Sequence, residues 1–269
     1  MRSFAIIQRD TFVGKGWLPH RGYSFCRSQT TLPLVAAELT KAAAAMPIAL
    51  IRDQNTGHFQ LIGLCSLDEG RNLFVAPDGK WLGGYVPAVL RGYPFGLARV
   101  ENSEQVLLAI DEASGLVVNN SEANAQPFFD KQGAPADTVR QILGFLTQVD
   151  ANLITTNRAL LHLQEADLIV PWTITLNTEG NTKNVNGLFR IDIDKIRSLN
   201  NNDFLKLREN DALFLAFNQS FSTAHINIFE TLSQIQNKME DTNKIHKKTI
   251  ENSFAVIKDD DIKFDWSNI

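Results

Sequence analysis

Between residues 139 and 163, apolar residues recur with helical spacing, so helical structure is expected in the middle of this 269-residue chain. Asp137 is placed to cap its start. The pattern predicts one long helix, or a kinked pair, over 138–165. The apolar stripe comprises Val139, Ile142, Leu143, Leu146, Val149, Leu153, Leu160 and Leu163.

Short extended segments precede this helix. Apolar runs at 48–52 and 58–65 are separated by turn-forming residues, which is typical of a hairpin. Residues 72–81 repeat the arrangement around a Pro-Asp-Gly turn, and 105–111 has the composition of a further buried strand. We therefore expect a strongly bent, mostly antiparallel sheet over 48–110.

A shorter helix is expected over 34–46, since an alanine-rich run is bracketed there by Pro33 and Pro47. After the long helix, apolar runs within 168–191 predict a second hairpin. Helical patterns then follow at 194–199, 203–217 and 221–239. The fold class is therefore α+β, with a helical C-terminal part.

The domain organisation predicted from these patterns is one composite globular unit over 1–239, with a possible subdivision in the loop-like stretch 114–135. Residues 240–269 form a peripheral charged tail. The stretch 238–251 is charged and lacks an apolar stripe, so we expect a mobile tether. It leads to a possible terminal strand in which Ile262, Phe264 and Trp266 alternate with polar residues.

Composition and charge exclude several classes of function. The net charge is −4 and basic residues are scattered, which disfavours nucleic-acid binding. No apolar run approaches the roughly 20 residues needed to span a bilayer, and no export signal is visible. The two cysteines, Cys26 and Cys65, lack CxxC spacing and are interpreted as buried free thiols. We expect a soluble cytoplasmic protein, without membrane insertion; the oligomeric state stays open.

The segment 81–95 is the best candidate for a binding site. It combines Trp81, Tyr85, Tyr93 and Phe95 with the guanidinium of Arg91 and several glycines, a composition suited to an aromatic-lined groove for a peptide or flat ligand. The alternative is that these aromatic side chains fill the core while the glycines make turns.

No catalytic or metal-binding signature accompanies this segment, and no catalytic residue, metal or cofactor is predicted. His20 and Cys26 lack the further ligands that a closed metal site needs. The serine at position 114 stands outside any GxSxG motif.

Eight segments carry a family resemblance: PLVAAE, MPIAL, NLFV, WLGGYVP and LRGYPF at 33–38, 46–50, 72–75, 81–87 and 90–95, followed by AIDE, PFFD and GLFRID at 109–112, 127–130 and 187–192. In order and spacing they resemble the SapC family, over roughly residues 20–232. That family is named after a surface-layer-associated protein. Its members often stand beside genes for TonB-dependent receptors, tryptophan halogenases and cupin-like dioxygenases, which suggests a bacterial role in nutrient uptake or in modifying a peptide or protein.

The resemblance and the absence of a catalytic motif together lead to one main hypothesis, an adaptor that binds a protein or peptide partner. Two alternatives stay open. One is a peptide-modifying or oxygenase-like enzyme with a site of dispersed polar residues, and the other is a structural surface-layer component.

Overall fold

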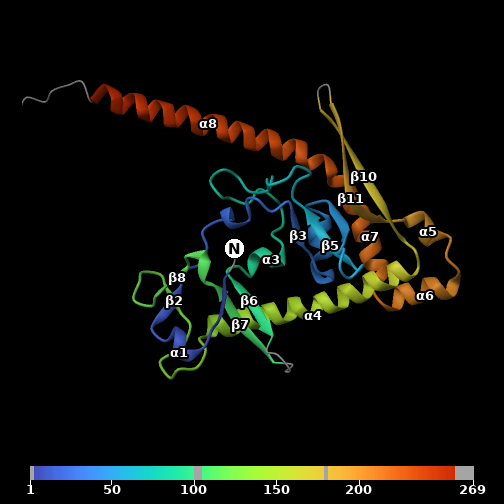
Figure 1. Ribbon diagram of the computed structural model, residues 1–269, viewed down its shortest axis with the longest axis horizontal. Coiled ribbons are helices and arrows are strands. Elements are labelled where there is room, and N and C mark those ends of the chain that lie inside the picture. Colours follow the sequence, from blue (N-terminus) through green and yellow to red (C-terminus); the bar gives the residue numbers. More distant parts are fainter. Residues whose placement is uncertain (1–2, 100–104, 179–180, 258–269) are drawn as a thin grey trace, which may run out of the picture.

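The computed structural model describes residues 3–99, 105–178 and 181–257 and has the α+β architecture expected from the sequence. Its largest sheet contains five antiparallel strands in the order β10-β11-β4-β5-β3 (Figure 1). Two of the three predicted hairpins, β4–β5 and β10–β11, belong to this sheet. Its strands are β3 (Thr31–Pro33), β4 (Ile48–Arg52), β5 (Phe59–Leu64), β10 (Ile169–Thr178) and β11 (Asn181–Ile191).

One helix stabilises the junction between the two hairpins by hydrogen bonds from its side chains. Helix α7 (Ala212–Ser222) carries Gln219, whose side chain accepts a hydrogen bond from the Ile191 amide (3.0 Å) and donates one to the Ile48 carbonyl (2.9 Å). The Ser222 hydroxyl accepts from the Ile48 amide at 2.9 Å. Both side chains are buried, so α7 satisfies backbone groups at a point where β11 and β4 share only a short register.

Two further sheets of three antiparallel strands each complete the β structure. The strands expected between residues 48 and 110 divide between the large sheet and one of these, and the hairpin expected at 72–81 is reduced to a single bridge between Val75 and Trp81. The loop-like stretch 114–135 contributes two short strands. The small sheets are β1 (Phe4–Ile6), β7 (Val106–Asp111) and β6 (Phe95–Arg99), and β8 (Val117–Asn119), β2 (Lys15–Trp17) and β9 (Gln126–Pro127).

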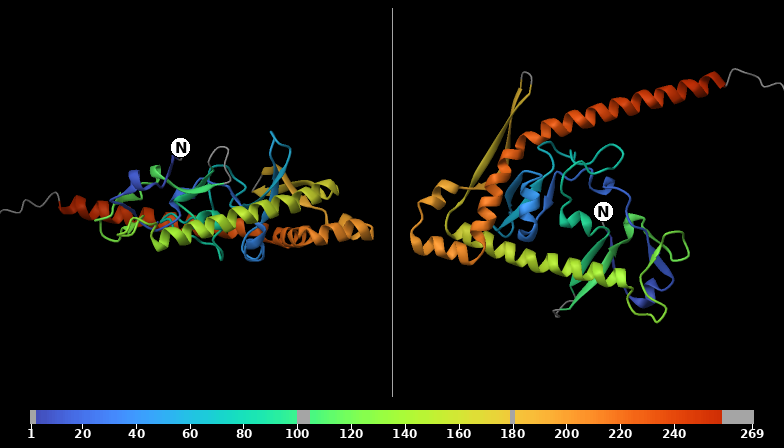
Figure 2. Two further views of the ribbon diagram at one scale, coloured as in Figure 1. Left: turned by 90° about the horizontal axis from the view of Figure 1, so that it is seen from below. Right: turned by 180° about the vertical axis from the view of Figure 1, so that it is seen from behind.

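Helix α4 (Asp137–Glu165) is a single helix of 29 residues and runs along both β regions (Figures 1 and 2). Its N-terminal half packs into the core of the small sheets through Val139 and Leu146, and its C-terminal half packs against the large sheet through Leu160 and Leu163. The capping role expected of Asp137 is wrong. Asp137 is the first helical residue and the cap position is Ala136, without a side-chain hydrogen bond.

The helix expected over 34–46 is shorter than predicted. A 3₁₀ helix, η2 (Ala36–Glu38), leads into α2 (Leu39–Ala43). The amide of Leu34 still pairs with the carbonyl of Leu61 on β5 (3.0 Å), so the chain cannot turn helical directly after Pro33. The remaining short helical elements before α4 are α1 (Arg9–Phe12), η1 (Ser24–Cys26), α3 (Ala88–Arg91) and η3 (Glu112–Ser114).

The C-terminal part is helical, as predicted, with one break that the pattern did not indicate. The helix expected over 203–217 is divided into two, because Asp211 adopts a left-handed conformation (φ +57°) between them. The elements are α5 (Ile193–Arg197), α6 (Asn201–Glu209), α7, the 3₁₀ helix η4 (Thr223–Asn227) and α8 (Ile228–Ile257).

Helix α8 replaces the mobile tether expected over 238–251. Lysine, glutamate and methionine are good helix formers, and Asp241 and Lys244 form an ion pair one turn apart (3.5 Å). Gln236 fixes the helix to the body by donating to the Asn72, Leu73 and Val75 carbonyls, beyond which α8 extends away (Figure 1).

The proposed terminal strand of Ile262, Phe264 and Trp266 lies outside the described residues. Within the described part of the chain, no helix is both long and apolar enough to cross a membrane.

The packing of α4 predicts that Gly144→Ala stabilises the protein. A Cβ at Gly144 would meet no atom within 4 Å, and glycine inside a helix costs about 0.5–1 kcal/mol relative to alanine. Urea unfolding should show a gain of that size. As a matched control, Gly16→Ala should destabilise, because its Cβ would lie 2.8 Å from the Gln126 carbonyl oxygen. A loss of stability in Gly144→Ala would contradict this description of the exposed helix face.

Candidate functional site

A cleft of about 380 Å³ opens where four parts of the chain meet, and we call it the Arg91 cleft. It lies between the N-terminal half of α4, the turn from α3 to β6, the segment after β2, and strand β9. The side chains that define it are Trp17, His20, Arg91, Tyr93, Phe95, Gln141 and Phe145.

Gly92 brings the α3–β6 turn close to α4. A Cβ at this position would lie 2.8 Å from Cδ2 of Leu146, so a side chain here would force either the Leu146 side chain or the turn to shift. Pro87 directly precedes α3, and its fixed φ suits the entry into a helix. The sequence between these two residues thus places Arg91 at the end of a single helical turn, beside α4.

Stacked aromatic rings form one side of the cleft. Tyr93 lies parallel to Phe25, with ring centroids 3.6 Å apart, and His20 contacts both rings in edge-to-face geometry. Phe95 packs edge to face with Trp17, with centroids 4.9 Å apart. Aromatic pairs in these geometries hold each other in place, so this side of the cleft is formed without a ligand.

His20 is the one imidazole that lines the cleft. Its Nδ1 lies 3.1 Å from the carbonyl oxygen of Gly22, which only accepts, so Nδ1 carries the proton and Nε2 is the acceptor of the neutral ring. The described lining contains no carboxylate or thiol that could pair with this histidine.

Arg91 lines the cleft, and its guanidinium lies close to two aromatic rings. Its guanidinium carbon lies 5.1 Å from the ring centroid of Phe145 and 5.8 Å from that of Tyr85. One nitrogen, Nη2, donates to the Tyr85 hydroxyl at 3.1 Å. Arg91 forms no ion pair with any described residue, so most of its five donors remain available.

A buried carboxylate fixes Tyr85 and, through it, Arg91. Glu38 is 5% exposed and accepts three hydrogen bonds, from the Val35 amide (3.1 Å), the Ala88 amide (2.7 Å) and the Tyr85 hydroxyl (2.9 Å). All three donors come from within the protein, which is what a buried carboxylate requires. Glu38, Tyr85 and Arg91 also line a smaller cavity of about 170 Å³ beside the Arg91 cleft.

The five residues singled out in the sequence separate into three positions. Arg91, Tyr93 and Phe95 line the Arg91 cleft together. Tyr85 lines the smaller cavity next to it. Trp81 lies in the core at 8% exposure, and its indole Nε1 donates to the Tyr85 carbonyl at 2.8 Å.

Sequence reasoning missed the residues that complete the site from distant segments. Trp17 and Phe145 come from β2 and α4, and nothing in their local sequence marks them. Glu38 could have been identified from the sequence, because it is the one charged residue in the apolar run 34–40. A lone acid in such a run is either exposed or buried with dedicated donors, and the second applies here.

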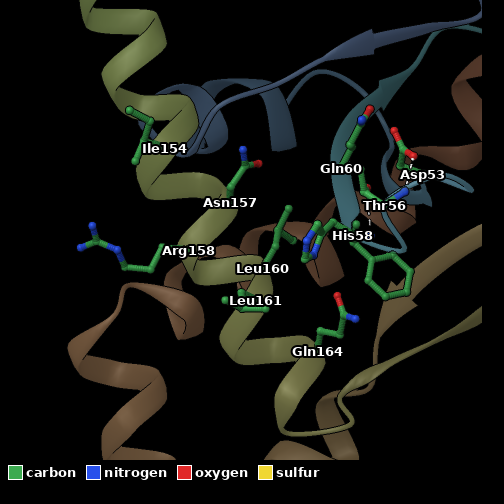
Figure 3. Close-up of a pocket in the computed structure, with 11 residues that line it drawn as sticks. Asp53, Thr56, His58, Gln60, Ile154, Asn157, Arg158, Leu160, Leu161 and Gln164 are labelled. Atoms are coloured by element: carbon green, nitrogen blue, oxygen red, sulfur yellow. Dashed lines mark hydrogen bonds between the residues drawn. The ribbon is translucent and has the colours of Figure 1, made fainter. Parts of the chain in front are cut away.

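A second, larger groove of about 540 Å³ lies between the β4–β5 turn and α4 (Figure 3). Its polar side chains do not converge. His58, Thr56 and Asp53 lie on one side of the helix, while Arg158 extends away on the other (Figure 3). Asp53 is occupied by its own turn, where the Thr56 and Asn55 amides donate to its carboxylate and lower its pKa.

The cysteines and histidines do not assemble a metal site in the described part of the chain, which holds no cluster of three or more potential ligands. Cys26 donates its thiol hydrogen to the Tyr23 carbonyl, and His20 is engaged with Gly22. Cys65 is buried, and its burial, together with the nearby Cys26, raises the pKa of its thiol well above the usual range. A thiol in that state is a poor nucleophile and ligand.

The network around Glu38 predicts an alkaline transition. Burial, and then the Glu38 carboxylate, raise the pKa of Tyr85 from 10.0 to about 12. The folded state therefore holds this proton more tightly than the unfolded state, so the stability contribution is complete below pH about 10 and is lost as pH rises towards 12.

Difference spectra of the parent protein and Tyr85→Phe should show a phenolate titrating near pH 12. Over the same range, the free energy of unfolding should fall more steeply in the parent protein. A Tyr85 midpoint near 10 would contradict the predicted shift.

Comparison with known proteins gives one assignment. No curated protein and no solved structure matches the chain significantly. The SapC family matches residues 7–229, which include β2, α3, β6 and the part of α4 that form the Arg91 cleft. The match covers most of the chain and confirms the resemblance seen in its segments. The protein belongs to the SapC family.

Proposed function

We propose that this protein binds a peptide or an exposed protein segment in the Arg91 cleft, as an adaptor rather than a catalyst. One observation carries the proposal. An aromatic-lined cleft of about 380 Å³ contains a guanidinium that no described residue neutralises. Apolar walls with a few fixed polar groups are the usual composition of ligand sites, which have volumes of about 300–1,000 Å³.

The packing around the cleft favours binding, because the side chains that would contact a ligand are already ordered. Tyr93 is stacked on Phe25, Phe95 packs edge to face with Trp17, and Arg91 is held by Tyr85. Ordering a side chain on binding costs about 0.5–1.5 kcal/mol, and a preformed cleft avoids much of that cost.

A catalytic role has less support from the same residues. An activated nucleophile needs a base that is itself oriented by a third group, and His20 is the candidate base in the cleft. The described lining offers Arg91 and Tyr93 but no carboxylate or thiol. The surface-layer role rests on the family name, and no feature of the cleft bears on it.

Selection from a random peptide library displayed on phage tests the proposal. The parent protein should enrich a consensus sequence, and the enriched peptides should lose at least about tenfold in affinity for Gln141→Trp. Gln141 is an exposed residue of α4 that lines the cleft, so an indole at this position fills the cleft without entering the core.

Thr147→Trp provides the matched control. Thr147 is also exposed on α4, and its position on the helix faces away from the cleft. This variant should bind the selected peptides like the parent protein. A selection that yields no consensus, or peptides equally sensitive to both substitutions, would refute binding in the Arg91 cleft.

A further inference from the structure

We infer that the Arg91 cleft selects peptide segments in which a carboxylate stands next to an aromatic or large aliphatic side chain. This inference rests on the proposed peptide-binding function and specifies its ligand. It follows from the charges at the cleft, the geometry of one guanidinium and the apolar surface beside it.

The charged groups at the cleft leave an excess of positive charge. Arg91 in the cleft and Lys41 in the smaller cavity beside it form no ion pair within the described part of the chain. Glu38, the carboxylate bonded to the Tyr85 hydroxyl, is buried and already accepts from three donors of the protein. Glu38 therefore orients the site but is not exposed to a ligand, and a ligand that brings its own negative charge is complementary.

The geometry of Arg91 suits a carboxylate better than a single acceptor atom. The phenyl ring of Phe145 and the phenol of Tyr85 flank the guanidinium, and the Tyr85 hydroxyl takes one hydrogen bond from Nη2. The remaining donors form a planar fork, which matches the two oxygens of a carboxylate in a bidentate pair.

A second donor occurs in the same cleft. The indole Nε1 of Trp17 is buried and has no hydrogen-bond partner among the described residues. Buried donors without acceptors are uncommon, and a ligand oxygen would remove that deficit. The atom is covered by protein, so Arg91 is the donor that a ligand in the cleft contacts directly.

The apolar requirement follows from the surface next to Arg91. Phe145 and Ile142 of α4 line the cleft together with Tyr93, and all three side chains are partly exposed. An aromatic or aliphatic side chain placed between them is removed from water on both sides, which is favourable at about 25 cal/mol per Å² of apolar surface. The residue that carries the carboxylate and the apolar residue are therefore neighbours in the ligand.

An array of synthetic hexapeptides tests the inference. Each peptide pairs one residue, Phe, Leu or Ala, with a neighbour, Glu, Gln or Lys, in both orders. Further peptides end in Phe with a free or an amidated carboxyl group, which separates a side-chain carboxylate from a chain terminus as the anionic group. Affinities of the full-length protein for each member are measured by fluorescence anisotropy.

We expect Phe-Glu and Leu-Glu peptides, or peptides with a free terminal carboxylate, to bind best. Arg91→Gln should weaken these complexes by about 10- to 100-fold and leave the affinity for Gln peptides nearly unchanged, because only the charged hydrogen bonds are lost. Arg91→Lys should restore part of the loss, since it returns the charge without the planar fork. Arg158→Gln, at an exposed arginine of α4 outside the cleft, should behave like the parent protein.

Three results would overturn the inference. Equal binding of Glu and Gln peptides would refute the requirement for a carboxylate, while the proposed peptide-binding function would still stand. Equal losses for Glu and Gln peptides in Arg91→Gln would indicate a purely structural role for this residue. If no peptide in the array binds, the proposed peptide-binding function is refuted together with the inference.

Discussion

The shape of the Arg91 cleft depends on one buried carboxylate. Glu38 accepts from two backbone amides, one near its own position and one 50 positions away at Ala88, and from the Tyr85 hydroxyl. Removal of any one of these acceptor contacts leaves a donor without a partner, and an unpaired buried donor costs about 1–3 kcal/mol. Glu38 thus ties the η2 turn to α3, and it positions Arg91 through the phenol of Tyr85.

Helix α4 provides the second constraint, because one apolar stripe serves two cores. Its first half packs with β6 and β7 and its last turns pack with β4 and β5. Thr156, between the two halves, accepts a hydrogen bond from the Ala36 amide at 2.8 Å and so joins the helix to the segment that carries Glu38. The cleft lies along the first half of α4, so its α4 wall is held rigidly from both ends.

Sequence patterns predicted those parts of the structure that depend on local signals. The turn residues at 53–57 identify β4–β5, and helical periodicity identifies α4. Arg91, Tyr93 and Phe95 were found together because they are neighbours in the chain. Trp17, Phe145 and Glu38 join them only through tertiary contacts, which a local pattern cannot show. The tether expected at 238–251 was wrong, because a charged stretch without an apolar stripe still has high helix propensity.

The central claim is that Glu38 holds the cleft in its ligand-ready form before any ligand arrives, and amide hydrogen exchange of Val35 and Ala88 tests it most directly. Both amides donate to the Glu38 carboxylate, at 3.1 Å and 2.7 Å. In the free protein they should therefore exchange as slowly as the amides of β4 and β5, and Glu38→Gln should accelerate both. Exchange of these two amides at the rate of an unstructured chain in the parent protein would show that the network does not persist in solution, and it would contradict the account.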